Sequence, residues 1–144
     1  MVTVIGPNDP TKMAIATYDP AAIAQQVAGT TAAQTLTNKR ITKRVVAYSA
    51  NAATYSVNTY SYDVVHITAQ TATITSIATT GTPVDGDTLR ISITGTAAVP
   101  FTLSATNFEA STVPLSTTTT GTARLDMGFF YNSETSKWRQ VATA

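Results

Sequence analysis

The chain has 144 residues, no cysteine and a charged fraction of only 12%, with nine basic and eight acidic side chains that give a formal net charge of +1. This length suffices for one domain with a sizeable core, and the absence of cysteine excludes disulfides and thiolate chemistry. The nearly balanced charge favours neither nucleic acid nor a membrane as partner. No apolar run is long enough to cross a bilayer, and Met1–Pro10 lacks the order of a secretory signal, so we expect a soluble protein made in a cytoplasm.

The first 44 residues differ in charge from the rest of the chain. They carry five basic and two acidic side chains, a net charge of +3, whereas residues 45–144 carry four basic and six acidic ones, a net charge of −2. We therefore predict an extended N-terminal attachment arm over residues 1–44 and one globular domain over residues 45–144. An arm that wraps its own domain or a symmetry mate is an equally weighted alternative.

A short helix is predicted within the arm, near residues 20–28. Asp19 and Pro20 suit the N-cap and first position of a helix, and Gly29 suits its end. Because two turns are marginal alone, the stripe formed by Ile23 and Val27 needs an apolar partner surface.

The body of the chain is rich in threonine, with 30 among the 144 residues. Threonine is β-branched and fits a pleated, half-exposed surface, so this composition favours strands over helices. The clearest alternation places Leu89, Ile91 and Ile93 toward a core and Arg90 outward. Strands are predicted at 45–49, 55–58, 63–69, 72–77, 88–94, 101–104 and 125–131, with Trp138 in a last returning strand.

The order of these strands predicts an all-β fold, an antiparallel β-sandwich of jelly-roll-like topology. The segments 63–69 and 72–77 are separated by little more than a turn, which favours an antiparallel opening, and 132–136 is expected to turn a final hairpin. A small closed barrel is the alternative. The sequence shows no internal repeat, and we interpret Thr117–Thr120 as a loop.

The chain carries no clear catalytic signature, and we predict that it is not an enzyme. His66 is the only histidine and lies within a predicted strand, where a structural role is the more frequent one. None of the serines lies in a G-x-S-x-G elbow. Composition alone leaves a Ser-His-Asp relay or a pair of glycosidase carboxylates open, and hydrolysis of a polysaccharide is a minor third hypothesis.

Asp85-Gly86-Asp87 offers two hard oxygen ligands that calcium can use. The same residues suit a tight turn, because aspartate and glycine tolerate left-handed backbone conformations, and we favour the turn. Neither a metal nor a cofactor is therefore expected.

Two groups of residues are candidates for recognition. Tyr60 and Tyr62 offer aromatic faces and hydroxyl groups suited to sugar rings, although tyrosines in a sandwich more often fill a core edge or a subunit interface. The densest charge lies in the basic cluster, where a solvated hinge competes with pairing to acidic groups of a neighbouring subunit. That cluster consists of Lys39, Arg40, Lys43 and Arg44.

The stretch Gln34–Ile41, which contains T-L-T-N-K, resembles a phrase that precedes globular modules in tail-fibre and head-fibre proteins of tailed bacteriophages. A looser resemblance extends over Asp85–Ala97, Phe108–Val113 and Thr122–Phe129. The resemblance implies a virion structural protein, made in the host bacterial cytoplasm, and a homotrimer like those of head-decoration and fibre proteins.

We therefore expect a non-enzymatic capsid decoration or head-fibre protein whose arm binds the major capsid protein or another virion protein. The arm residues expected at the attachment site are Ile23, Val27, Leu36, Lys39, Arg40, Lys43 and Arg44. The alternative is a receptor- or glycan-binding module of a tail or fibre tip that uses Tyr60, Tyr62 and the loop Ser116–Gly121.

Overall fold

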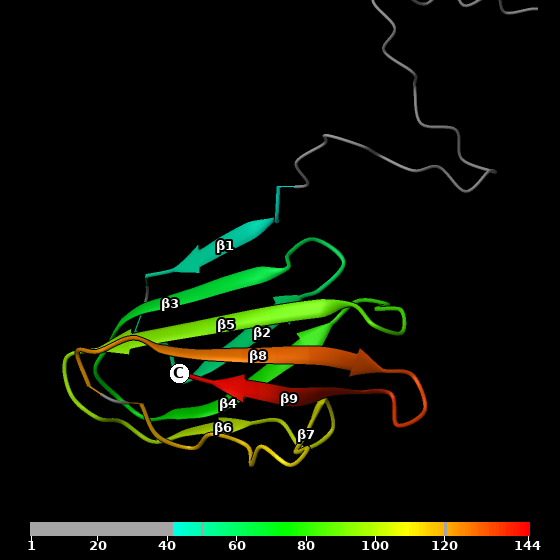
Figure 1. The fold of residues 1–144 in the computed structure, drawn as a ribbon. Helices are drawn as coiled ribbons and strands as arrows, with labels where there is room; N and C mark the ends of the chain where they lie inside the picture. The colour runs from blue at the N-terminus through cyan, green and yellow to red at the C-terminus, as the bar shows by residue number, and fades with distance from the viewer. Residues whose placement is uncertain (1–41, 50, 120) are drawn as a thin grey trace, which may run out of the picture. The chain divides into compact units, whose positions relative to one another are not determined.

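The computed structural model describes residues 42–49, 51–119 and 121–144, and this part of the chain is built from strands without a helix (Figure 1). The all-β prediction is confirmed, and each predicted strand overlaps an observed one. The arm segment before residue 42, including the helix predicted near 20–28, lies outside the described residues. The strands are β1 (Val45–Tyr48), β2 (Thr54–Asn58), β3 (Val64–Gln70), β4 (Ile74–Thr80), β5 (Thr88–Gly95), β6 (Phe101–Leu103), β7 (Phe108–Glu109), β8 (Leu125–Asn132) and β9 (Lys137–Thr143).

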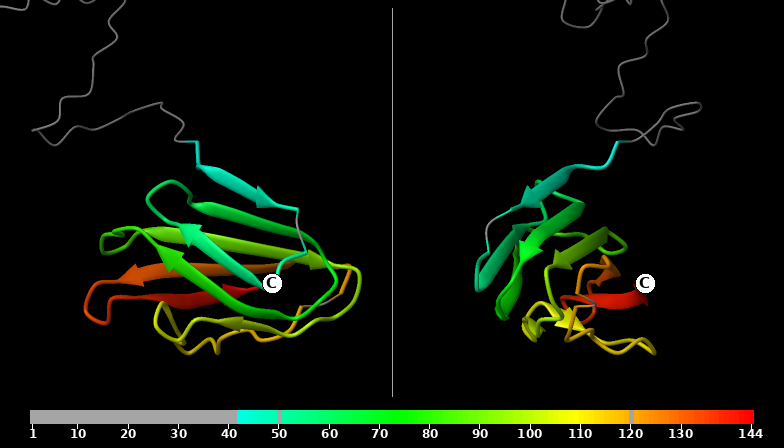
Figure 2. Two further views of the ribbon diagram at one scale, coloured as in Figure 1. Left: turned by 180° about the vertical axis from the view of Figure 1, so that it is seen from behind. Right: turned by 90° about the vertical axis from the view of Figure 1, so that its left-hand side faces the viewer.

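The first six strands alternate between two sheets. A six-stranded sheet has the order β1-β3-β5-β8-β9-β7, and a three-stranded sheet has the order β2-β4-β6. The pairs β1–β3, β3–β5, β2–β4 and β4–β6 are all parallel. The chain therefore winds through three coils, each with one strand in either sheet, and the smaller sheet lies behind the larger one in Figure 1 and in front of it in the left view of Figure 2.

The prediction of an antiparallel opening is wrong, and the pairing is not that of a jelly roll. Antiparallel strand pairs are β5–β8 and β8–β9, which include the predicted final hairpin. The short connection between β3 and β4 carries the chain across to the other sheet instead of folding it back within one. Strand alternation specifies which side chains are buried, but it does not distinguish a hairpin from a crossing of this kind.

The core consists of rows of apolar side chains stacked from coil to coil. One row in the larger sheet runs Val46, Val65, Ile91 and Met127, and the next runs Tyr48, Ile67, Ile93 and Leu125. Ile67, Ile91, Ile93 and Met127 are fully buried. Burial of each such side chain stabilises the fold by about 1.5–3 kcal/mol. The predicted face of β5 is confirmed, since Leu89, Ile91 and Ile93 are buried and Arg90 is exposed.

A buried glutamine links the connection between β1 and β2 to the connection between β3 and β4. Gln70 is fully buried, and its amide nitrogen donates to the carbonyl oxygens of Ala52 at 3.2 Å and Ala72 at 2.6 Å. Its side-chain oxygen accepts a 2.8 Å hydrogen bond from the Tyr55 hydroxyl. Because each buried polar group has a partner, this residue holds two successive connections together at little desolvation cost.

Candidate interaction surfaces

The first coil is closed by tyrosine side chains. Tyr48, from β1, donates its hydroxyl to the carbonyl oxygen of Ser56 in β2 at 3.1 Å, and its ring centroid lies 5.4 Å from that of Tyr55. Burial raises the pKa of the Tyr48 hydroxyl, and the nearby Tyr62 adds to this shift. Tyr48 therefore joins the two sheets at the first coil of the core.

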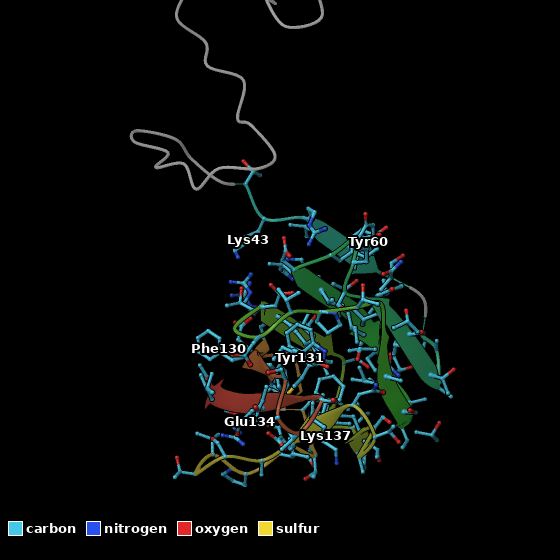
Figure 3. All side chains as sticks on the ribbon, turned by 90° about the vertical axis from the view of Figure 1, so that its right-hand side faces the viewer. Lys43, Tyr60, Phe130, Tyr131, Glu134 and Lys137 are labelled. Atoms are coloured by element: carbon cyan, nitrogen blue, oxygen red, sulfur yellow. The ribbon has the colours of Figure 1, made fainter. Side chains whose placement is uncertain are left out.

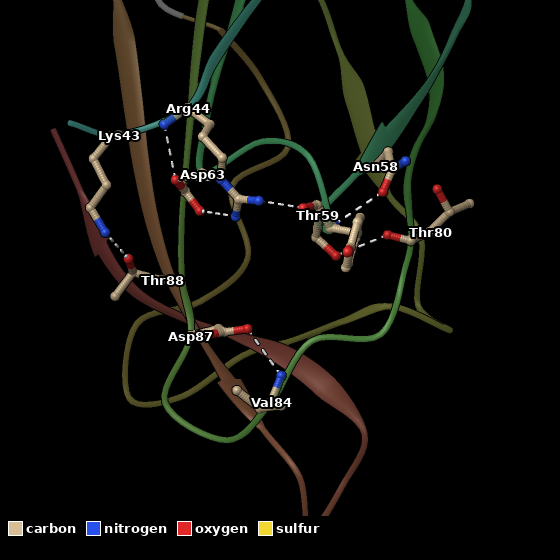
Figure 4. A network of polar contacts seen from close by, with 10 residues as sticks. Lys43, Arg44, Asn58, Thr59, Asp63, Thr80, Val84, Asp87 and Thr88 are labelled. Carbon is tan, nitrogen blue, oxygen red and sulfur yellow. Dashed lines mark hydrogen bonds and ion pairs between the residues drawn. The ribbon is translucent and has the colours of Figure 1, made fainter. Parts of the chain in front are cut away.

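A charged network fixes the start of β1 (Figure 4). The Arg44 guanidinium donates to the Asp63 carboxylate at 2.7 Å and to the carbonyl oxygen of Tyr60, while the Arg44 backbone N–H donates to Asp63 at 2.9 Å. These hydrogen bonds to Arg44 lower the pKa of Asp63, and the same carboxylate raises the pKa of Arg44. Lys43 donates from Nζ to the Thr88 hydroxyl at 3.1 Å.

Two of the predicted attachment residues, Lys43 and Arg44, thus bind their own domain. The side chain of Arg44 remains 53% exposed, so it also presents charge to solvent. Whether either residue contacts a particle stays a prediction. The other predicted attachment residues lie outside the described part, namely Ile23, Val27, Leu36, Lys39 and Arg40.

Tyr60 is an exposed aromatic side chain on a braced loop. It is 73% exposed, yet its backbone N–H donates to the Asn58 side chain at 3.0 Å and its carbonyl oxygen accepts from Arg44. Gly81 supports this loop closely, because a Cβ there would lie 2.9 Å from the Tyr60 nitrogen. The loop therefore holds the Tyr60 backbone in place while the ring faces solvent.

The two predicted glycan-contact tyrosines have different environments. Tyr62 is half-buried, whereas Tyr60 is open to solvent. Figure 3 places Tyr60 apart from Phe130, which is 48% exposed, and from Tyr131. The ring of Tyr131 packs edge-on against Trp138, with 5.3 Å between centroids. Tyr60 is therefore the more accessible tyrosine of the predicted pair.

The Asp85-Gly86-Asp87 segment forms the expected turn. The Asp87 N–H donates to the Val84 carbonyl oxygen at 3.1 Å, and Gly86 has a φ of +82°, a left-handed value that favours glycine. The Asp85 carboxylate accepts from the Ser133 N–H at 2.9 Å, and this hydrogen bond lowers the pKa of Asp85. The Asp87 carboxylate accepts from the Val84 N–H at 3.0 Å. Both carboxylates therefore hold backbone groups, and the described residues contain no cluster of three or more metal-binding side chains.

His66, Ser92 and Asp126 lie side by side on three adjacent strands of the larger sheet. The Ser92 hydroxyl donates to Asp126, and Arg124 donates to the same carboxylate at 2.7 Å. The Ser92 hydrogen bond is the main cause that lowers the pKa of Asp126. A relay needs the histidine between serine and carboxylate. Here the serine occupies the middle position and is only 2% exposed, so the arrangement does not present a nucleophile.

The loop Ser116–Gly121 is tied to the domain in its described portion. Thr119 is buried and pairs with the backbone of Val99, and Phe101 N–H donates to the Thr117 carbonyl oxygen at 2.8 Å. Ser116 is hydrogen-bonded to the buried Gln140. The segment therefore covers the outer edge of β6 and is less accessible than the sequence suggested.

Comparison of the chain with protein-family models, curated proteins and solved structures found no match. Within the described residues, no helix is long and apolar enough to cross a membrane.

Sequence reasoning did not identify Tyr48 or β1 as parts of a candidate surface. Nothing in the local sequence marks Tyr48 as the bridge between two sheets. The available signal was the strand V-V-A-Y itself, which directly follows the basic cluster and contains no charge.

Proposed function

We propose that this chain is a non-enzymatic structural protein of a bacteriophage particle, of the capsid decoration or head-fibre type, attached through its N-terminal arm. The observation that carries the proposal is the division of the chain after Arg40, so that Ile41–Ala144 forms a unit of its own. This unit contains its own core cluster of buried residues. A body of this kind leaves the first 40 residues for a separate task, and the resemblance of Gln34–Ile41 to fibre proteins suggests attachment.

The proposed attachment combines apolar and polar contacts. Ile23 and Val27 bury a stripe of the arm against the major capsid protein or another virion protein, and the cluster Lys39–Arg44 pairs with acidic groups there. A homotrimer would present three arms, and the first bound arm would raise the effective concentration of the others. The protein would be made in the host bacterial cytoplasm and reside in the virion.

Deletion of residues 1–29 is the direct test of attachment. We expect the truncated protein to keep the cooperative urea unfolding of the full chain but to lose co-sedimentation with particles. A single substitution, Ile23→Asp, should weaken binding strongly, whereas Gln25→Asp, which adds the same charge on the opposite side of the predicted helix, should not. Full binding by the deletion variant would refute the arm as the attachment element.

A receptor- or glycan-binding module is the second candidate, and the braced, 73% exposed Tyr60 favours it. An aromatic face on a fixed backbone can stack on a pyranose at low entropic cost. On a glycan array, the full chain should then bind a defined sugar class, and Tyr60→Ala should abolish the signal. Tyr62→Ala should weaken it less, and Phe130→Ala, which removes another exposed aromatic ring, should leave it intact. Silence across a broad array would exclude this function.

A further inference from the structure

An exposed aromatic ring lies beside an exposed ion pair where the connection between β2 and β3 meets the start of β1. The Tyr60 side chain is 73% exposed, and its backbone carbonyl oxygen accepts a hydrogen bond from the Arg44 guanidinium. Asp63 is the main group that raises the pKa of Arg44, and Tyr60 makes a smaller contribution, so the phenol lies within range of the guanidinium charge. A ligand that stacks on Tyr60 would therefore meet the Arg44–Asp63 pair.

This ion pair keeps hydrogen-bonding capacity for a ligand. Arg44 donates from Nε to Asp63 Oδ2 at 3.2 Å, from Nη2 to Oδ1 at 2.7 Å, and from Nη1 to the Tyr60 carbonyl oxygen. A guanidinium has five N–H groups, so two of them have no partner among the described residues. The Arg44 side chain is 53% exposed, and that of Asp63 is 21% exposed. Asp63 Oδ1 accepts one hydrogen bond, from Arg44, and keeps room for a second.

A pyranose ring matches these three groups. Each sugar hydroxyl both donates and accepts, so two adjacent hydroxyls fit a guanidinium donor and a carboxylate acceptor placed side by side. The apolar C–H face of the ring packs against an aromatic face such as that of Tyr60. A purely apolar ligand would instead desolvate Arg44 and Asp63 without replacing their hydrogen bonds to water, which is costly.

The charges around the ion pair favour a neutral sugar over an acidic one. Lys43 adds to the lowering of the pKa of Asp63 that Arg44 causes. Asp87 adds to the raising of the pKa of Arg44 that Asp63 causes. Among the described residues, two cations and two anions therefore act on one another here (Figure 4). A sugar carboxylate would meet no excess positive charge to offset the cost of its desolvation.

We propose that Tyr60, Arg44 and Asp63 form a binding site for a neutral hexose with two adjacent free hydroxyl groups. Tyr60 stacks on the sugar ring, Arg44 donates to one hydroxyl, and Asp63 accepts from the neighbouring one. The inference rests on glycan binding, the second candidate function above, and adds to it the class of sugar and two binding residues. It does not depend on whether the chain attaches to a particle through its N-terminal arm.

A glycan array that carries neutral hexose oligosaccharides beside sialic-acid- and uronic-acid-containing ones tests the site with the full chain. We expect binding to neutral members, with little change between about 0.05 and 0.5 M NaCl, because no net charge is paired. Arg44→Lys keeps the charge but loses the planar fork, and it should weaken binding at least about tenfold. Arg124→Lys is the matched control, because the Arg124–Asp126 pair has the same 2.7 Å separation and Arg124 a similar exposure, 54%. It should bind as the unmodified chain does.

Monodeoxy analogues of the neutral oligosaccharide that binds best separate direct contact from support of the loop. Removal of the hydroxyl that Arg44 recognises should weaken binding to the unmodified chain about tenfold and binding to Arg44→Lys much less. If every deoxy analogue weakens both proteins equally, Arg44 only holds the Tyr60 loop, and the proposed site is wrong.

The remaining outcomes separate this site from the broader function. A preference for acidic sugars, or binding that survives Arg44→Lys but not Tyr60→Ala, would overturn the site and leave glycan binding through Tyr60 in place. Silence across the array would exclude both the site and the second candidate function. Co-sedimentation with particles tests attachment separately, so none of these results decides it.

Discussion

The two ends of the coiled core are closed by different means. At the first coil, side chains close it, with Tyr48 reaching from β1 to the backbone of β2. At the last coil, backbone closes it: β8 pairs with β5 in the larger sheet, and residues 117–119 cover β6 in the smaller one. A closure by backbone uses the hydrogen-bonding groups of the edge, whereas a closure by side chains leaves β1 without a second strand partner among the described residues. The two ends of the core therefore differ in whether backbone or side-chain groups bind the outermost strand.

The largest effect on stability should come from a buried side chain of β8, the strand that closes the last coil in the larger sheet. Phe129, in β8, is 2% exposed and packs on Phe108 with 5.0 Å between ring centroids. Phe129→Ala should lower the free energy of unfolding by about 3–5 kcal/mol, because it leaves a cavity beside the ring of Phe108. Its neighbour Phe130 faces solvent, and Phe130→Ala should change stability by no more than about 0.5 kcal/mol. Urea unfolding of both variants checks this, and equal losses would contradict the burial described for β8.

Two glycines of the larger sheet should respond oppositely to alanine. At Gly95, at the end of β5, a Cβ would lie 2.4 Å from the Gln70 carbonyl oxygen, whereas at Gly128, in β8, the nearest atom would be the Ala142 Cβ at 3.5 Å. Gly95→Ala should therefore destabilise the protein by about 1–3 kcal/mol through forced backbone shifts. Gly128→Ala should be neutral or slightly stabilising, by at most about 1 kcal/mol. Thermal unfolding measures both, and a harmless Gly95→Ala would show that the strands are less tightly apposed there.

A smaller effect is expected where a side chain closes the first coil. Tyr48→Phe keeps the ring but removes the hydrogen bond to Ser56, and it should cost about 0.5–1.5 kcal/mol. Tyr60→Phe removes a hydroxyl from a side chain that is 73% exposed and should leave the urea midpoint unchanged. If both variants unfold at the unmodified midpoint, Tyr48 does not join the sheets energetically.

The smallest expected effect is a dependence of stability on pH through Asp63. Its folded-state pKa is lowered by the hydrogen bonds from Arg44, so its contribution is present above the unfolded pKa of about 3.9 and is lost as pH falls through the folded pKa. Asp63→Asn should reduce the loss of stability between neutral pH and about pH 3, by at most about 1 kcal/mol for so exposed a pair. Glu134→Gln, at an exposed carboxylate without an ion pair in the described residues, should keep the full decline. If Asp63→Asn loses as much stability between neutral pH and about pH 3 as the unmodified protein does, the ion pair of Asp63 with Arg44 does not stabilise the fold.

Strand positions were largely predictable from the sequence, because a strand with one buried face alternates apolar and polar residues. Leu89, Ile91 and Ile93 face the core as their alternation requires. Which strands pair with one another was not predictable. The sequences of β3 and β4 have the pattern of half-buried strands whether the two form a hairpin or lie in separate sheets. The short β7 was missed because Phe108–Glu109 gains its strand character from pairing with Trp138 and Arg139, far along the chain.

The candidate surfaces were predictable only where a residue acts locally. The turn at Asp85–Asp87 follows from the chemistry of aspartate and glycine, and the structure confirms it. The place of β1 as a terminal strand depends on how all the strands pair, which is a property of the whole topology. Tyr60 and Tyr62 look alike in sequence, and nothing local predicts that Tyr60 is exposed while Tyr62 is half-buried.

Quantitative mass spectrometry of purified particles tests the central claim most directly, by counting copies of this chain against the major capsid subunit. The account predicts that the chain is a stoichiometric component of the washed particle. A copy number comparable to that of the capsid subunit would place it on the head lattice, and a small number would move it to a fibre or tail. Its absence from washed particles, with the protein abundant in the host lysate, would contradict the claim that it is a virion protein.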